Sequence, residues 1–331
     1  MRSSTAPVGE RLTASRSRHE IRVASPYRLD LTVSVLRRLS SNVVDVLRSD
    51  GQYVRVLGER DPVTIRVAQA APDRLTITIE GDAREHGKAL ALARRVLGVE
   101  RDLAHFDRAA ARIPWLKGLA ARMRGVRPPR YPTLWESCVN AIVFQQISLR
   151  AASAILRRLV IALGTPLSSE GDDLYAFPPA IRLLSAEDSV LHAAGLSRGK
   201  LATLRRVAEA LAAAKLDQEM LEGRPSPAAA TLLRGIKGIG PWTAAVILLR
   251  GLGRLDVFPG QDTSVARNLV LVAGTPPPDI SRVLRALSPQ QGMLYYHLLL
   301  ARLEARDELG RPTSAAPRRS NERHRDHTQR T

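Results

Sequence analysis

The spacing of apolar residues changes near position 85, and this change constrains the fold of the chain more than any other feature of its sequence. Before that point apolar residues recur at every second position, which predicts short antiparallel strands in segments 29–33, 54–56, 63–67 and 75–79. From residue 85 to 97 the spacing becomes helical, and no convincing strand pattern returns after residue 100. The chain is therefore predicted to be α+β, with an N-terminal antiparallel-sheet domain followed by an all-α domain.

Glycine and proline residues divide the second part of the chain into helical segments. The predicted helices lie at 133–147, 149–163, 178–183, 186–193, 198–214, 227–234, 241–251, 262–272, 279–286 and 290–305. We place the α+β domain at 26–100 and the all-α domain at 101–306. Segments 1–25 and 307–331 are rich in arginine and lack hydrophobic periodicity, so both are predicted to be disordered basic arms.

The charge of the chain favours a polyanionic partner. It has 50 Lys+Arg against 32 Asp+Glu, a net charge of +18, and the two arms account for less than half of that excess. Nucleic acid is the leading class of partner, and an arginine-rich source proteome is the alternative explanation. The single cysteine, Cys138, excludes a disulfide framework within the chain and any four-cysteine metal site. No apolar run approaches the roughly 18 residues of a membrane span, so we expect a soluble protein without a membrane partner.

A glycine-rich segment between two predicted helices has the character of an anion site. One helix is predicted to end before Gly235, and the next begins at Pro241, where a missing N–H costs no hydrogen bond. Exposed N–H groups of the turn and the positive end of the second helix would bind a phosphate. We predict that Gly235, Lys237, Gly238 and Gly240 contact the DNA backbone. An ordinary helical turn with a glycine cap is the alternative.

An aspartate, Asp262, follows this hairpin after one predicted helix and one loop. The segment Phe258-Pro259-Gly260 predicts a rigid turn, so Asp262 falls at or just before the start of a helix. Taken alone, Asp262 reads as an N-cap that accepts from free helix N–H groups. Such N–H groups also keep a carboxylate ionised, so capping and a catalytic role are compatible.

Together, the hairpin and the Phe-Pro-x-x-Asp loop resemble the helix-hairpin-helix superfamily of base-excision DNA glycosylases. The resemblance implies that Asp262 is catalytic and that its carboxylate stabilises a sugar with oxocarbenium character. Trp242 stands where superfamily members that cut the strand carry a lysine, which implies a monofunctional enzyme that leaves an abasic site. A cationic alkylated base leaves without a general acid, and no cofactor or catalytic metal is implied.

Further motifs resemble the 3-methyladenine DNA glycosylase II family. Residues 134–148 are similar to that family's helix and wedge-bearing turn, with Gln146 or Ile147 as the wedge and Gln145 beside it. Residues 195–200 are similar to a family segment near DNA, which implies DNA contacts by Arg198 and Lys200; a solvated basic helix end is the alternative. The strand-rich first domain resembles the family's N-terminal domain only loosely.

A flipped base needs an aromatic or apolar pocket. Trp242 is the leading candidate for this pocket, followed by Tyr295, Tyr296 and Phe144, although any of these rings can belong to the core instead. Some family members carry a pocket tryptophan on the last helix, where this chain has Leu299. This departure leaves open which damaged bases the pocket accepts.

The resemblance predicts a monofunctional DNA glycosylase of base-excision repair that excises alkylated bases of the 3-methyladenine and 7-methylguanine type. A glycosylase for oxidised or deaminated bases and a non-catalytic lesion-sensing protein are the alternatives. The expected partner is damaged double-stranded DNA, and the expected state is a monomer. We expect it at the nucleoid in the cytoplasm of a bacterium, or in the nucleus of a eukaryote.

Overall fold

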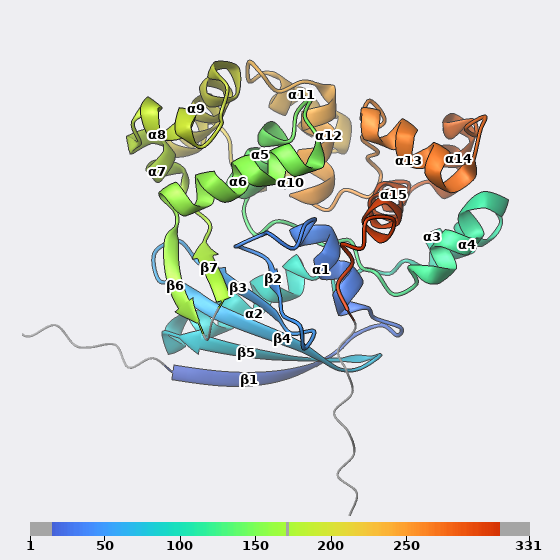
Figure 1. Ribbon diagram of the computed structural model, residues 1–331, viewed down its shortest axis with the longest axis horizontal. Helices are drawn as coiled ribbons and strands as arrows, with labels where there is room; N and C mark the ends of the chain where they lie inside the picture. Colours follow the sequence, from blue (N-terminus) through green and yellow to red (C-terminus); the bar gives the residue numbers. More distant parts are fainter. Residues whose placement is uncertain (1–14, 170–171, 312–331) are drawn as a thin grey trace, which may run out of the picture.

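The computed structural model describes residues 15–169 and 172–311, and it places a helical layer on one side of an antiparallel sheet (Figure 1). The sheet has the order β1-β5-β4-β3-β2, and every pairing is antiparallel. Its strands are β1 (Ser15–Arg22), β2 (Val46–Leu47), β3 (Tyr53–Leu57), β4 (Val63–Ala71) and β5 (Arg74–Gly81). The predicted α+β class is confirmed, as are the strands expected at 54–56, 63–67 and 75–79.

The core of the sheet follows from the period-two pattern. Alternate residues of β5, Leu75, Ile77 and Ile79, are fully buried and pack with α2 (His86–Val96), which follows a short 3-10 turn, η1 (Ala83–Glu85). Ala89 and Ala93 are small enough to let α2 lie close to the sheet.

The prediction of a disordered arm over residues 1–25 is wrong for its second half, while residues 1–14 lie outside the described part. Strand β1 (Ser15–Arg22) pairs with β5 along its whole length. Its side chains are mostly polar and only Ile21 is buried, so apolar periodicity gave no signal. The stability of this edge strand comes from main-chain pairing instead. At the other end, residues 307–311 also pack on the body, since Gly310 donates its N–H to Ser34 Oγ at 2.8 Å.

The predicted strand at 29–33 is also wrong, because this segment opens helix α1 (Leu29–Arg37). The helix is buried on two opposite sides. Leu29 and Val33 pack into the core of the sheet, whereas Leu31 and Val35 pack into the core of the helical layer. A helix with two apolar faces shows apolar residues at alternate positions and therefore imitates a strand.

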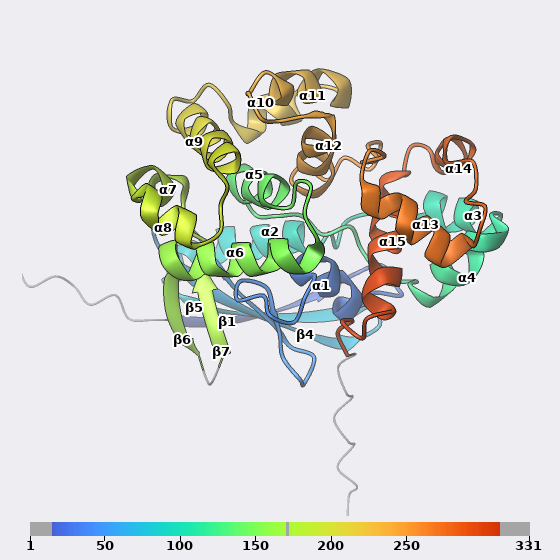
Figure 2. The same ribbon diagram turned by 45° about the horizontal axis from the view of Figure 1, so that its top comes forward.

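The helical layer contains the following helices in chain order: α3 (Ala104–Ala111), α4 (Pro114–Arg122), α5 (Leu134–Val143), α6 (Leu149–Leu163), α7 (Ala180–Ser185), α8 (Asp188–Ala193), α9 (Arg198–Ala212), α10 (Gln218–Glu222), α11 (Ser226–Arg234), α12 (Pro241–Arg250), α13 (Thr263–Ala273), α14 (Ile280–Leu287) and α15 (Gly292–Glu304). The sequence did not predict α3, α4 or α10. Figure 2 shows the same layer from another side, and in both views α12 lies between α5 and α13. None of the helices in residues 15–169 and 172–311 combines the length and apolar character that a membrane span requires.

The second part of the chain is not purely helical, which corrects the all-α prediction. Strands β6 (Thr165–Ser169) and β7 (Asp172–Ala176) form a hairpin. Leu174 of β7 is buried against Val54 and Val56 of β3, so the hairpin extends the contact between the helical layer and the sheet. The strands are short, and Pro166 within β6 had marked the segment as a break between helices.

Candidate active site and DNA-binding interface

The glycine-rich segment forms a tight hairpin between α11 and α12. Its turn is closed by the Ile239 N–H, which donates to the Ile236 carbonyl at 3.0 Å, and Ile239 is buried in the core. Within the described part of the chain, the N–H groups of Lys237, Gly238 and Gly240 donate to no protein acceptor. These donors lie next to the N-terminus of α12, which is the arrangement that an anion site requires.

The glycines of the hairpin serve different purposes. Gly238 has a φ of +102°, and a Cβ at this position would lie 2.0 Å from Thr203 Oγ1, so the turn itself requires glycine. Gly240 has an ordinary φ of −87°, and no atom lies within 4 Å of where its Cβ would stand. The fold of the protein therefore does not itself require glycine at position 240.

Replacing Gly240 with valine is expected to weaken affinity for duplex DNA by about tenfold, because the branched side chain stands in the path of the phosphate. The melting temperature should change little, since a Cβ at this position meets no protein atom. Fluorescence anisotropy with a labelled duplex measures the affinity. Gly87→Val is the matched control. A Cβ at Gly87 also meets no protein atom, but Gly87 lies in α2, which packs on the sheet and does not line the cleft. Unchanged affinity in Gly240→Val would contradict the role of the hairpin.

The turn after α5 is tied to the hairpin. Gln145 Nε2 donates to the Gly238 carbonyl at 3.0 Å and to Thr243 Oγ1 at 2.6 Å. Gln146 follows with a φ of +55° and is exposed, and Ile147 is 38% exposed. Gln145 therefore fixes the position of the turn, and its two exposed neighbours are the residues that project from it.

The two basic residues at the start of α9 differ in their surroundings. Arg198 is exposed, but Lys200 donates from Nζ to the Val143 carbonyl at 2.7 Å and so caps the end of α5. Partial burial lowers the pKa of Lys200. Lys237 is exposed on the hairpin, and its carbonyl accepts from Arg206 at 3.3 Å. Among the described residues no acceptor pairs with the cationic ends of Arg198 and Lys237, whereas the Lys200 ammonium is bound within the protein.

Asp262 is the N-cap of α13, as its position after the Phe-Pro-Gly turn predicts. Its Oδ1 accepts the N–H of Ser264 at 2.8 Å, and its Oδ2 accepts the O–H of Tyr295 at 3.2 Å. Burial and the adjacent Asp262 carboxylate raise the pKa of Tyr295, so the phenol remains a hydrogen-bond donor. Both carboxylate oxygens are therefore held by donors from different helices, which fixes the orientation of the group.

Asp262 lines a cleft of about 2170 Å³ that is open to solvent. The cleft gathers residues that are far apart in the sequence, from the hairpin (Gly238, Gly240), the turn after α5 (Gln145, Gln146, Ile147), α12 (Trp242) and α15 (Tyr295, Leu299). Trp242 packs on the helical core, and its Nε1–H is buried without a hydrogen-bond partner among the described residues. The cleft thus places a fixed carboxylate, an aromatic wall and a set of free backbone donors together.

Two of the aromatic candidates differ from the sequence-based prediction. Tyr296 is fully buried in the core, and its O–H donates to the Leu249 carbonyl at 3.2 Å, so it does not line the cleft. Successive side chains of a helix point about 100° apart, so only one of the two tyrosines can face the cleft. On α15 that residue is Tyr295. Phe144 lines the cleft, but the guanidinium of Arg38 lies over its ring, 3.6 Å from the ring centroid.

The sequence did not predict several polar residues of the cleft, among them Arg38 and Asn268. Arg38 comes from the end of α1, and Asn268 comes from α13 with its Oδ1 buried and unpartnered among the described residues. No local pattern pointed to Arg38, since it follows a segment that resembles a strand. Asn268 lies within a helix among apolar residues, and a buried polar residue on an apolar face was the available signal.

Part of the chain is similar to known DNA repair proteins. Residues 139–288, which contain the turn after α5, the hairpin and Asp262, match the family model of the HhH-GPD superfamily base excision DNA repair protein. A probable bifunctional transcriptional activator/DNA repair enzyme AlkA of Mycobacterium tuberculosis is 32% identical over 216 residues, which cover 64% of this chain and 42% of the relative. DNA-3-methyladenine glycosylase 2 of Escherichia coli is 28% identical over 180 residues, or 54% of this chain and 62% of the relative.

A solved structure supports the fold over most of the chain. The 3-methyladenine DNA-glycosylase of Archaeoglobus fulgidus aligns with a TM-score of 0.72 and 24% identity, covering 87% of this chain and 99% of the other. The chain spans about half the length of the curated relatives that it matches first. The resemblance to the 3-methyladenine glycosylases is confirmed, and the shared fold includes the sheet.

Proposed function

We propose that this protein is a monofunctional DNA glycosylase that excises alkylated bases from duplex DNA, because residues 139–288 match the family model of the HhH-GPD superfamily base excision DNA repair protein. The observation that carries the proposal is Asp262, held by two hydrogen bonds on the wall of a cleft bordered by the glycine-rich hairpin. The names of the relatives, which include DNA-3-methyladenine glycosylases, support the alkylated substrate class.

The proposed chemistry uses the Asp262 carboxylate at the sugar. A flipped nucleotide enters the cleft, and positive charge develops on the sugar as the bond to the base breaks. The fixed carboxylate stabilises that charge and orients the water that attacks the sugar carbon. None of the described residues that line the cleft is a lysine, so no amine is placed to form a Schiff base with the sugar. The expected product is an abasic site in an uncut strand.

The DNA would be held by the hairpin on one side and the turn after α5 on the other. The free N–H groups of Lys237, Gly238 and Gly240 would bind a phosphate, and Gln146 or Ile147 would fill the space that the flipped nucleotide leaves. We propose that the protein works as a monomer on damaged duplex DNA, at the nucleoid of a bacterium or in the nucleus of a eukaryote.

Product analysis tests the proposed function directly. Duplex DNA treated with a methylating agent is incubated with the protein, and the released bases are separated by chromatography. Release of 3-methyladenine or 7-methylguanine, with the strand left uncut until alkali is added, is the expected result. A protein that binds the DNA but releases no base from methylated, deaminated or oxidised duplexes would instead be a lesion-sensing protein.

Replacing Tyr295 with phenylalanine is expected to lower the rate constant of base excision by about tenfold, since removing one donor leaves Asp262 less well oriented. The ring remains, so stability and DNA affinity should stay close to those of the wild type. Single-turnover kinetics on an oligonucleotide with one 7-methylguanine measures the rate. Tyr175→Phe is the matched control, because that tyrosine is half-buried on β7 and does not line the cleft. Equal rates in Tyr295→Phe and the wild type would exclude an orienting role for the phenol.

A further inference from the structure

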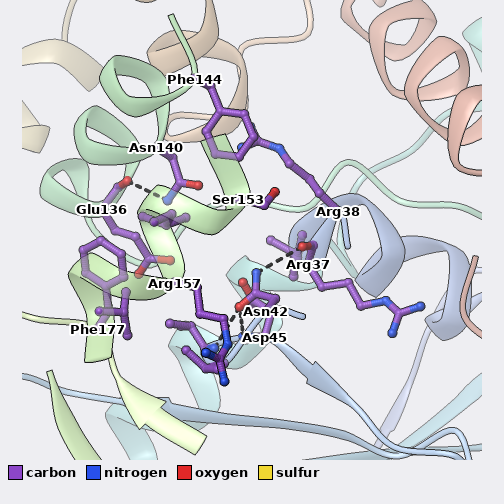
Figure 3. Close-up of a pocket in the computed structure, with 15 residues that line it drawn as sticks. Arg37, Arg38, Asn42, Asp45, Glu136, Asn140, Phe144, Ser153, Arg157 and Phe177 are labelled. Atoms are coloured by element: carbon purple, nitrogen blue, oxygen red, sulfur yellow. Dashed lines mark hydrogen bonds between the residues drawn. The ribbon is translucent and has the colours of Figure 1, made fainter. Parts of the chain in front are cut away.

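The buried side chain of Arg38, at the end of α1, lines the proposed base pocket. Arg38 caps the C-terminus of α1 with a φ of +58°, and its N–H donates to the Ser34 carbonyl. Only 5% of the residue is exposed. Figure 3 shows its side chain extending to the ring of Phe144, over which the guanidinium lies at 3.6 Å from the centroid.

This guanidinium has unused hydrogen-bonding capacity. Nη1 of Arg38 is buried without a partner among the described residues, and no described carboxylate forms an ion pair with the group. Burial and the neighbouring guanidinium of Arg250 lower the pKa of Arg38 to about 10, so the side chain remains charged at neutral pH. A buried charged donor without an acceptor is costly, which indicates that an acceptor joins it in the working complex.

The position of Arg38 changes what Phe144 can do. A positively charged alkylated base would gain from stacking on an aromatic face, but Arg38 already covers the Phe144 face with a charge of the same sign. Arg38 and Asp262 line the same cleft. The base that enters must therefore tolerate the nearby cation of Arg38 while its sugar meets the Asp262 carboxylate.

The charge of the leaving base decides which substrates gain from this arrangement. When the bond between sugar and base breaks, its electron pair stays on the base nitrogen, and the attacking water forms the new bond to the sugar carbon while releasing a proton to Asp262 or solvent. A cationic 7-methylguanine becomes neutral in this step. A neutral purine such as hypoxanthine becomes an anion until it takes a proton from water, and a nearby guanidinium stabilises that anion.

We propose that Arg38 is a specificity-determining residue of the base pocket, which assists the departure of neutral bases that carry a carbonyl oxygen and disfavours cationic alkylated purines. This inference rests on the proposed function, because it presumes that the cleft excises bases. It assigns the selection between neutral oxopurines and cationic alkylated purines to a residue outside the region that matches the family model.

The test compares two substrates in one set of variants. Oligonucleotide duplexes carry either one hypoxanthine or one 7-methylguanine, and single-turnover rate constants are measured for the wild type and for Arg38→Met. Excision of hypoxanthine should fall on the order of 100-fold, whereas that of 7-methylguanine should stay within about threefold or rise. Arg37→Met is the matched control, since Arg37 is the preceding residue of α1 and does not line the cleft with Asp262.

The ratio of the two rate constants is the decisive quantity, because it does not depend on the folded fraction of a destabilised variant. Arg38→Lys keeps the positive charge, so its ratio should stay closer to that of the wild type than to that of Arg38→Met. An equal loss on both substrates in Arg38→Met would overturn the inference and reduce Arg38 to a packing role, while the proposed function would stand. A wild type that releases neither base would instead overturn the proposed function.

Discussion

Replacing Asp262 with asparagine should lower the rate constant of base excision by about 1000-fold while affinity for duplex DNA stays within about threefold. The carboxylate is the charge that opposes the developing oxocarbenium ion, and a neutral amide cannot replace it. The amide can keep the local structure, because its oxygen still accepts the Ser264 N–H and its nitrogen can donate to the Tyr295 oxygen. The loss should therefore appear in catalysis and not in folding.

Three measurements separate these contributions. Single-turnover kinetics on a 7-methylguanine duplex gives the excision rate, anisotropy with a duplex that contains an abasic-site analogue gives the affinity, and thermal melting gives the stability. Asp256→Asn is the matched control, because this exposed aspartate lies in the loop before Asp262, does not line the cleft and carries the same charge. An Asp262→Asn variant that excises bases as fast as Asp256→Asn would show that another group carries the reaction.

The parts of the site that could be predicted from sequence are those whose chemistry is local. Three glycines within six residues indicate a tight turn or a close approach by a partner. Either interpretation needs only the residues of the hairpin itself. Asp262 is similar, because the rigid turn before the helix determines which residue becomes the N-cap, whatever the rest of the fold. Such features do not depend on what packs around them.

The parts that could not be predicted depend on contacts between distant segments. Arg38 reaches the cleft because α1 is buried between the sheet and the helical layer, and that double burial made its sequence resemble a strand. The choice between Tyr295 and Tyr296 as the cleft residue depends on how α15 is rotated against α13, which neither residue type determines. The pairing of β1 likewise depends on the free edge of β5 and hardly on its own apolar content.

One buried ionic cluster links the sheet to the helical layer. Arg55 of β3 donates to Asp45, which precedes β2, and to Glu136 of α5, and all three side chains are almost fully buried. Tyr53 adds a hydrogen bond to Asp45 at 2.8 Å. One guanidinium therefore balances two carboxylates. Burial raises the pKa of Glu136 to about 7, with the Asp45 charge adding to the rise and Arg55 opposing it.

Replacing Arg55 with methionine is expected to lower the free energy of unfolding by about 3–5 kcal/mol at about pH 8, because it leaves the buried Asp45 and Glu136 carboxyl groups without a cation. Urea denaturation at about pH 5.5 and about pH 8 measures the effect. In the variant the pKa of Glu136 should rise further above its unfolded value. The native state then binds more protons than the unfolded state, so the loss of stability should be smaller at the lower pH.

The control for this prediction removes the charges together. Asp45→Asn and Glu136→Gln added to Arg55→Met leave neutral groups of similar size, and this triple variant should recover much of the lost stability and lose the added pH dependence. A single variant that is equally destabilised at both pH values would attribute the loss to the packing of the Arg55 stem. Phe144 is the C-cap of α5 and lies beneath the guanidinium of Arg38, so a loosened cluster should also reduce the discrimination between hypoxanthine and 7-methylguanine. Recovery of that discrimination in the triple variant would show that the cluster fixes the position of α1 relative to α5 at the base pocket.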